Sequence, residues 1–486
     1  MRSPGEAASI NDASGSTGNG TDVMHWLPPW DLRRAEPPEW RERRFVSALL
    51  SGGDSRVAVD RATGVNRYFC PPRPAPEIAC LASCTASPIS AEGFAAASAC
   101  YREISEAGSP DATGACLARW HADVEAGLLA YFGAEALAEV IVLPSGTDTV
   151  LLMASMLALE SGDRPTTAIL PSLAETGTGV PRAVTCRSFD PGHRLDAPVV
   201  DREVTCVEVP LRKTNGDPRD DGEICAAFSA AAAAARGRPI VYLTHGSKTD
   251  LVAPLEVPPG ADVVVDACQM RIAPSVVRRY LRRGWPVIVT GSKFLGGPPF
   301  SGAVLLPRGR FARVRDRGLR AWHAANGGVA GDTDAALGPL LRWVSALGTL
   351  PALAKPGLSV PATIARLVRE VECVLSQLPN VRLLAGSSPS MFAVREWPAS
   401  IVTFAIDDPA EPGRLLTADE LRPVYRDLAR AGVLVGQPVE LGRVGGLRVA
   451  ISARDVITGD VSHGLRRLVD RLRCLERRAP APVPLP

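Results

Sequence analysis

A lysine closes an apolar run in the segment VIVTGSKFLGGPPFSGAVLLP, residues 287–307. Lys293 follows VIVTGS, which predicts the end of a buried strand, and Gly-Gly-Pro-Pro lies just beyond it. Burial disfavours the ammonium form, so a lysine in this position can present a neutral, nucleophilic amine. An ordinary surface lysine is the alternative, and Lys293 alone does not decide between the two.

An aspartate closes a second apolar run, in ADVVVDACQ. Asp266 follows three valines, and a carboxylate at the end of a core strand is costly to bury without a partner. A helix cap or a salt bridge would supply such a partner. So would a cationic group of a bound ligand, and the sequence leaves both interpretations open.

Small hydroxyl residues follow a third apolar run, EVIVL. Pro-Ser-Gly-Thr-Asp comes directly after it and leads into the predicted helix TVLLMASMLALES. Ser145, Gly146 and Thr147 therefore stand at a helix N-terminus, where backbone N–H groups and hydroxyls can bind an anion such as phosphate. The same residue types are preferred helix caps, so the motif by itself also fits a cap.

Polar residues end a fourth strand as well, where PIVYLT is followed by HGSKT with His245 and Ser247. Ligands of open parallel sheets bind beyond the carboxyl ends of the strands, so four polar strand ends together indicate one binding site. Other nucleotide and hydrolase motifs are missing. The chain has no GxGxxG after a strand, no P-loop order around TGSKF and no GxSxG elbow.

The elements that must position these residues are short apolar runs alternating with helical stretches from about residue 92 onward. The runs lack polar alternation, which is typical of parallel strands covered on both faces. Strand–helix alternation predicts an α/β fold with a large doubly wound, mostly parallel sheet. After residue 308 the order changes to helices plus two strands, IVTFAI and GLRVAIS, which predicts a smaller C-terminal α+β domain.

Composition shifts suggest the division of the chain. We expect a disordered N-terminus at 1–25, an N-terminal extension and arm at 26–115, a large domain at 116–325, an interdomain helix at 326–355, a small domain at 356–478 and a Pro-rich tail at 479–486.

Bulk composition excludes several classes of protein. The 486 residues include 54 basic and 52 acidic side chains, and this balance gives no electrostatic case for binding nucleic acid or a membrane surface. No apolar segment approaches a membrane span, and the N-terminus lacks the apolar core of a secretory signal. Eleven scattered cysteines without a CxxC pair favour reduced thiols and a cytoplasmic location over zinc or disulfides.

Taken together, these motifs resemble the fold-type I pyridoxal-phosphate (PLP) enzymes, the aspartate aminotransferase superfamily, and are most similar to the class V aminotransferases. The resemblance spans roughly residues 80–475. PSGTD is similar to the family's phosphate cup, VVVDACQ to the strand whose aspartate pairs with the pyridine nitrogen, and TGSKF to the strand ending in the Schiff-base lysine. The resemblance implies a PLP cofactor, a seven-stranded type of large sheet, and a homodimer with active sites at its interface.

The same resemblance implies roles for further residues. Gln269 would face the cofactor's 3-oxygen, and His245 or Ser247 would lie beside that oxygen, although either fits equally well as a loop hydrogen-bonder. Arg448 would grip the substrate carboxylate, with a surface salt bridge as the alternative. Asn326 would reach the partner subunit's phosphate, and SCTASPIS, residues 83–90, resembles the stretch that lines the active-site entrance.

One departure concerns the group that covers the pyridine ring. Family members place an aromatic residue or histidine in the loop after the second strand, but TAILPSLAETGTGVPRAVTC contains none. Glu175, Thr178 or another segment would have to cover the ring. The Trp-rich segment MHWLPPWDLRRAEPPEWRERRF is a further departure, because it is additional to the part of the chain that family members commonly have.

The resemblance implies an enzyme that transforms a small-molecule amino acid or amine through a Schiff base with the cofactor. An aminotransferase-like transferase, possible in specialised metabolism, is the leading expectation. Elimination or replacement at a β or γ carbon, or carbon–carbon bond formation, is the alternative because the same cup, aspartate and lysine serve all PLP chemistry. A regulator that binds PLP without catalysis is a third hypothesis.

Overall fold

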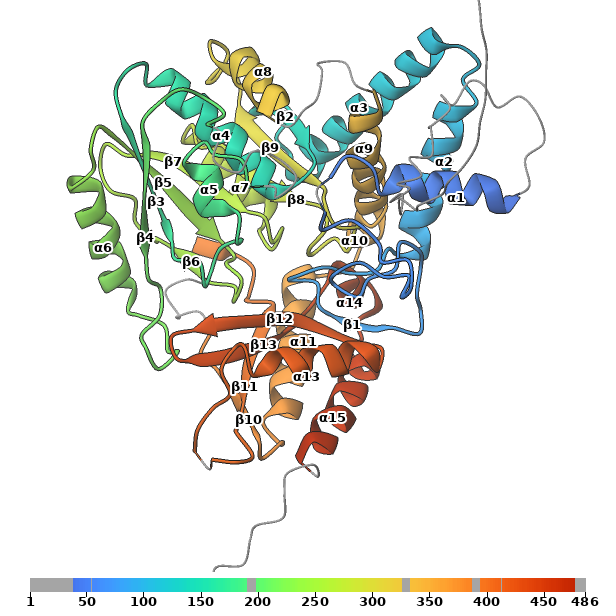
Figure 1. Cartoon of the computed structure of the whole chain (residues 1–486), viewed down its shortest axis with the longest axis vertical. Helices are drawn as coiled ribbons and strands as arrows, with labels where there is room; N and C mark the ends of the chain where they lie inside the picture. The colour runs from blue at the N-terminus through green and yellow to red at the C-terminus, as the bar shows by residue number, and fades with distance from the viewer. Residues whose placement is uncertain are drawn as a thin grey trace, which may run out of the picture.

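A computed structural model describes residues 38–53, 55–189, 198–325, 333–386, 394–411 and 413–476. Two β-sheets organise this part of the chain, a large one above and a smaller one below in the view of Figure 1. The predicted disordered N-terminus, the Pro-rich tail and Asn326 lie outside the described residues.

The large sheet has eight strands. Seven of them lie side by side in the order β2-β9-β8-β7-β5-β3-β4. The short strand β6 pairs with the last two residues of β5. All neighbours from β8 to β4 are parallel, whereas β9 runs antiparallel to both β2 and β8. The strands are β2 (Ala138–Leu143), β3 (Thr166–Pro171), β4 (Val204–Val209), β5 (Arg238–His245), β6 (Val252–Ala253), β7 (Asp262–Ala267), β8 (Val287–Thr290) and β9 (Gly302–Pro307). The expectation of a large, mostly parallel sheet is confirmed.

Helices cover both faces of this sheet, which explains why its strands read as continuous apolar runs. One face packs against α3 (Pro110–Phe132) and α7 (Pro274–Arg282), and the other against α4 (Gly146–Glu160), α5 (Val180–Val184) and α8 (Arg315–Ala325). Side chains alternate between the two faces: Val263 and Val265 of β7 join the first core, and Val264 joins the second. The helix α6 (Asp221–Ala233) packs near β3, β4 and β5.

The smaller sheet has the order β1-β12-β13-β11-β10. Its strands are β1 (Ala79–Leu81), β10 (Val381–Leu383), β11 (Ile401–Ile406), β12 (Val433–Leu441) and β13 (Val444–Ala450), with helices α11 (Val360–Leu375), α13 (Leu421–Arg430), α14 (Ala453–Thr458) and α15 (Ser462–Glu476). This agrees with the expected small α+β unit. Strand β1 comes from the predicted N-terminal arm and pairs in parallel with β12. With only three residues, β1 is too short for its sequence to predict a strand.

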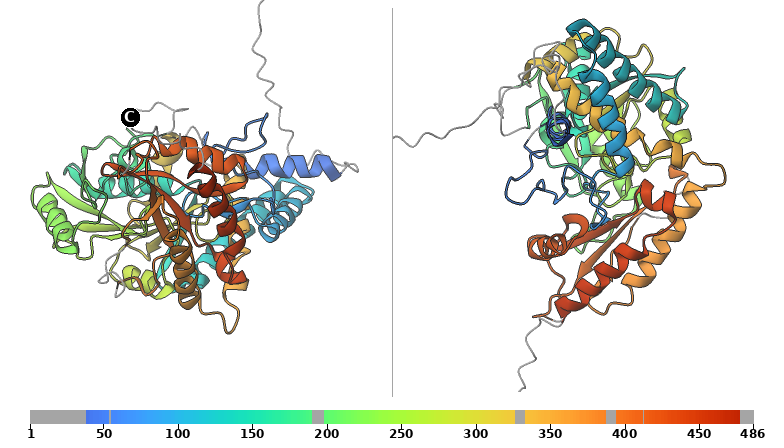
Figure 2. Two further views of the ribbon diagram at one scale, coloured as in Figure 1. Left: turned by 90° about the horizontal axis from the view of Figure 1, so that it is seen from below. Right: turned by 90° about the vertical axis from the view of Figure 1, so that its right-hand side faces the viewer.

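Helix–helix packing connects the N-terminal arm to the rest of the large domain. α1 (Pro38–Leu49) and α2 (Ala91–Ser105) both pack on α9 (Thr333–Leu347), which α10 (Leu350–Leu353) follows. Figure 2 shows these N-terminal helices in blue beside the rest of the molecule. Arg342 of α9 is fully buried and donates to the carbonyls of Leu49, Ser51, Gly52 and Phe300, so it clamps the arm onto the body. Within the described residues no helix meets the length and apolarity that a membrane crossing requires.

Candidate active site

The turn that carries Lys293 follows β8 and is held at close range by α9. A Cβ added to Gly291 would lie 2.6 Å from the Cβ of Ala346, and one added to Gly297 would lie 2.7 Å from the same atom. Both distances are shorter than real contacts, so only glycine allows the helix and the turn to approach this closely. The glycines around Lys293 therefore fix the position of the lysine relative to α9.

The Lys293 amine is half-buried and donates a hydrogen bond to the carbonyl oxygen of Thr85. Burial is the main reason that its pKa is lowered to about 8, and the positive charges of Arg448 and Arg56 lower the pKa further. A substantial fraction of the amine is then neutral near pH 8. This is the protonation state that imine formation requires.

Asp266 lies on β7, where strand alternation places it on the same face as Val264 and hence toward α4. Its carboxylate accepts a hydrogen bond of 3.0 Å from the backbone N–H of Cys268. Burial raises the pKa of Asp266, and no lysine or arginine of the described residues forms an ion pair with it. The carboxylate is thus enclosed without a cation, and a protonated ring nitrogen would supply one.

The N-terminus of α4 packs directly on the ends of β7 and β8. Ser145 is its N-cap, and the Ser145 hydroxyl accepts from the backbone N–H of Asp148 at 3.1 Å. A Cβ added to Gly146 would lie 2.6 Å from the Sγ of Cys268 and 3.0 Å from the Cγ2 of Thr290. Ser145 therefore acts as a helix cap. The first N–H groups of a helix have no partner within the helix and can bind an anion, so phosphate binding at the start of α4 stays a prediction.

Segment 83–90 brings three sequence-predicted residues together. Besides the bond from Lys293, Thr85 receives one from Arg448, whose Nη2 lies 3.3 Å from the Thr85 Oγ1. One residue earlier, the Cys84 carbonyl accepts a 3.1 Å bond from Nε2 of Gln269. The Oε1 of Gln269 is buried and has no hydrogen-bond partner among the described residues. Lys293, Gln269 and Arg448 thus meet at this segment although they are far apart in the sequence.

Arg448 of β13 is only 3% exposed, yet its hydrogen-bond partners are all neutral. Its Nη1 donates to the Lys248 carbonyl at 2.9 Å, and its Nη2 donates to the Gln437 carbonyl at 2.7 Å. No carboxylate in the described part of the chain pairs with this guanidinium, so the surface salt bridge considered from the sequence is not formed. A buried, uncompensated guanidinium is suited to bind an incoming carboxylate.

His245 does not join this group. It lies one position after Thr244 on β5 and points to the opposite face of the sheet, where its Nδ1 is 3.1 Å from the Tyr280 hydroxyl of α7. Burial, with the charges of Arg395 and Arg279, lowers the pKa of His245 well below its usual value. The proposed role of His245 beside the 3-oxygen is therefore not supported, because strand alternation directs it away from the face that carries Asp266.

Ser247 and Glu175 are also occupied elsewhere. The Ser247 hydroxyl donates to the Glu175 carboxylate at 2.7 Å, and Glu175 forms a buried ion pair with Arg212 at 2.8 Å. Because of these bonds, neither group is free to face a cofactor oxygen or to cover a ring. Thr178 is exposed, and a Cβ on its neighbour Gly179 would lie 3.0 Å from the Cγ2 of Thr147, so this loop borders the α4 N-terminus.

Comparisons with known proteins show the fold. No family model and no curated protein matches the chain. Among solved structures, a C-DES mutant with glycine covalently linked to its PLP cofactor is 16% identical, with a TM-score of 0.55 over 81% of this chain and 96% of that one. TDC from Oryza sativa, with PLP and tryptamine, is 14% identical with a TM-score of 0.53 over 96% and 92%. The cysteine desulfurase CsdA from Escherichia coli is 15% identical with a TM-score of 0.51 over 82% and 95%. The chain therefore has the fold of the fold-type I PLP enzymes, as its motifs suggest.

Proposed function

We propose that this chain is a PLP-dependent enzyme that transforms an amino acid, with Lys293 as the lysine that carries the cofactor. The observation that carries this proposal is the meeting at Thr85 of a half-buried amine with lowered pKa and a buried guanidinium without a carboxylate. When bound, PLP supplies an electron sink for charge that develops at the substrate α-carbon.

The residues present fit this cofactor. Asp266 is a half-buried carboxylate without a cation, which suits the protonated ring nitrogen. The backbone N–H groups of Gly146 and Thr147 at the start of α4, together with the helix dipole, suit the phosphate. The Oε1 of Gln269, which has no partner among the described residues, is a further polar group that would be available to the cofactor.

The roles of the chain's own residues follow from their positions. Arg448 would bind the substrate carboxylate by two hydrogen bonds and so orient the α-carbon toward Lys293. The Lys293 amine would then remove and return the proton at that carbon, a task for which a pKa near the working pH is best. The Thr85 carbonyl would hold the amine in place.

Transamination is the reaction that we propose first, on the resemblance to class V aminotransferases. A second candidate is elimination with cleavage of a carbon–sulfur bond, because the cystine C-S lyase C-DES in complex with cysteine persulfide shares the fold, with a TM-score of 0.51. The strand-end residues described above serve both reactions equally.

Absorbance spectroscopy tests the proposal. The purified protein with added PLP should show the visible band of a Schiff base, and a Lys293→Ala variant should lack that band. A protein that gains no band with PLP would refute the proposed function. Products then separate the two reactions. Transamination yields a keto acid and pyridoxamine phosphate without free ammonia. Elimination yields pyruvate and ammonia, with sulfide from cysteine or cysteine persulfide from cystine, and the aldehyde form of the cofactor is regenerated.

A homodimer is part of the same proposal. The resemblance implies active sites at a subunit interface, where Asn326 would reach the phosphate of the partner. Light scattering on the purified protein measures the mass directly. A monomer that is active at all concentrations would rule out a shared site.

A further inference from the structure

The loop after β5, residues 246–251, leaves a single side chain partly exposed. Lys248 is half-buried, whereas every other residue from 246 to 251 is buried. A rigid loop that buries all its side chains except one lysine fixes where that lysine can reach.

Buried charges anchor this loop on both sides of Lys248. The backbone N–H of Lys248 donates to the Glu175 carbonyl at 2.9 Å, and Thr249 donates to the Glu175 carboxylate at 2.8 Å. On the other side Asp250 pairs with Arg395 and accepts a 2.6 Å bond from the backbone N–H of Ser400. These contacts connect the loop both to Glu175, which follows β3 of the large sheet, and to Ser400, which directly precedes β11 of the smaller sheet.

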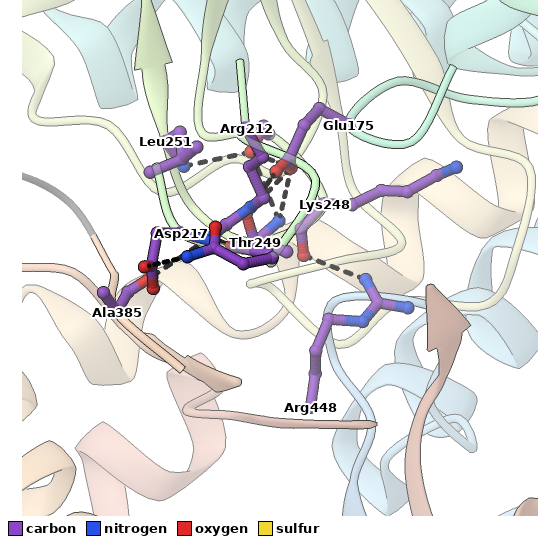
Figure 3. Close-up of polar contacts among 11 residues, drawn as sticks. Glu175, Arg212, Asp217, Lys248, Thr249, Leu251, Ala385 and Arg448 are labelled. Carbon is purple, nitrogen blue, oxygen red and sulfur yellow. Dashed lines mark hydrogen bonds and ion pairs between the residues drawn. The ribbon is translucent and has the colours of Figure 1, made fainter. Parts of the chain in front are cut away.

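The Lys248 side chain lies close to the active site. The carbonyl of Lys248 itself holds Arg448, and in Figure 3 the lysine extends above the Arg448 guanidinium and away from the Glu175–Arg212 pair. Its ammonium group donates to the Leu173 carbonyl at 2.9 Å. Burial, followed by the charge of Arg448, lowers the pKa of Lys248 to about 8, and Lys293 adds to this effect.

Positive charge is in excess around this position. The charge of Arg448 lowers the pKa of both Lys248 and Lys293, and the charge of Lys293 lowers that of Lys248. In the described part of the chain none of the three is paired with a carboxylate. The negative charge of Glu175 raises the pKa of Lys248, but Glu175 is already paired with Arg212. In the proposed function Lys293 engages the cofactor and Arg448 the substrate carboxylate, which leaves the charge of Lys248 without a counterion.

We propose that Lys248 binds a second anionic group at the far end of the substrate, so that the enzyme prefers amino acids with an acidic side chain. This inference rests on the proposed function and names its substrate class. The ammonium group exchanges a neutral carbonyl partner for an anion, and a charge-assisted hydrogen bond is about twice as strong as a neutral one.

Binding of two unreactive acids of equal length tests the inference. Glutarate carries two carboxylates and valerate one, and isothermal titration of the PLP-loaded enzyme measures both dissociation constants. We expect wild type to bind glutarate about tenfold more tightly than valerate, the ratio for one charge-assisted hydrogen bond of about 1.4 kcal/mol. Lys248→Gln should remove the preference for glutarate and leave valerate binding unchanged.

Matched variants separate the charge of Lys248 from the general effects of a substitution. Lys248→Arg keeps the positive charge and should keep the preference, whereas the exposed Lys355 serves as a control whose Gln variant should bind both acids like wild type. Equal affinities in wild type, a preference that survives in Lys248→Gln, or a preference lost in Lys248→Arg would each overturn the inference. The Schiff-base band is read in the same samples. A wild type without the band refutes the proposed function, whereas a normal band without a glutarate preference refutes only the role of Lys248.

Discussion

Two neighbouring groups of buried charges differ in how they are compensated. Around the loop after β5, Glu175 pairs with Arg212 and Asp250 pairs with Arg395, so each charge meets an opposite one. Around Lys293, by contrast, Lys293, Asp266 and Arg448 contact only neutral groups of the described chain. Since an isolated buried charge is costly, the paired group fits a structural role and the unpaired group fits binding of charged ligands.

Removing the amine of Lys293, which has no carboxylate partner among the described residues, should have the largest effect on activity. Lys293→Ala should abolish the Schiff-base band with PLP and lower turnover by on the order of 10³-fold or more, because both the attachment point and the proton-transfer group are lost. Absorbance and steady-state kinetics measure the two effects. The thermal midpoint of the protein without PLP should stay at or above that of wild type, since burial disfavours the lysine charge. A variant that turns over at wild-type rate would contradict the assignment of Lys293.

Breaking a pair in the other group should instead cost stability. Asp250→Ala leaves Arg395, which is 1% exposed, without its counterion, and we expect a loss of about 3–5 kcal/mol in the free energy of unfolding. Urea denaturation measures this loss. Arg422→Ala removes an exposed pair with Asp419 and should change the free energy by less than about 1 kcal/mol. Equal effects of the two variants would mean that burial does not distinguish these pairs.

Arg448 directly tests the difference between paired and unpaired charges, because it is nearly as buried as Arg395 but has no carboxylate partner among the described residues. Arg448→Met should raise KM for the amino-acid substrate by about tenfold or more, through loss of charge-assisted bonds to the substrate carboxylate. Its unfolding free energy should fall by less than that of Asp250→Ala, since no counterion is left unpaired. The Schiff-base band should remain. If KM stays unchanged while stability collapses, Arg448 belongs with the structural group.

Sequence alone predicted the elements and the chemistry of the strand ends, but not which charges meet. Apolar runs without alternation sufficed to predict a mostly parallel sheet. The motifs also placed Lys293, Asp266 and the start of α4 correctly at the ends of strands, whereas the roles of these residues stay predictions. His245 was misplaced because a shift of one residue along a strand reverses the face on which a side chain lies. That detail depends on where the strand ends, which the run PIVYLTHGS does not define.

The sequence also does not show which charged residues or strands that are distant along the chain pair with each other. Glu175 and Arg212 meet only because β3 and β4 are adjacent in the folded sheet, and nothing in either motif indicates the partner. Their pairing shows why Glu175 does not take the place of the ring-covering aromatic. The same holds for β1, whose parallel pairing with β12 precedes segment 83–90, where the Thr85 carbonyl accepts the hydrogen bond from Lys293.

The smallest expected effect concerns pH and separates Lys248 from its neighbours. The charged groups that act on it are Arg448 of β13, Lys293 after β8, and Glu175, which Arg212 neutralises. Because the pKa of Lys248 is lowered to about 8, its charge is present below that pH and is lost above it. Glutarate affinity of the PLP-loaded enzyme should therefore be constant at pH 6–7 and fall several-fold by about pH 9, toward the affinity for valerate. Arginine stays protonated throughout this range, so Lys248→Arg should bind glutarate equally well at both ends. A fall of the same size in Lys248→Arg would mean that another group titrates, and that this group rather than Lys248 binds the second anion.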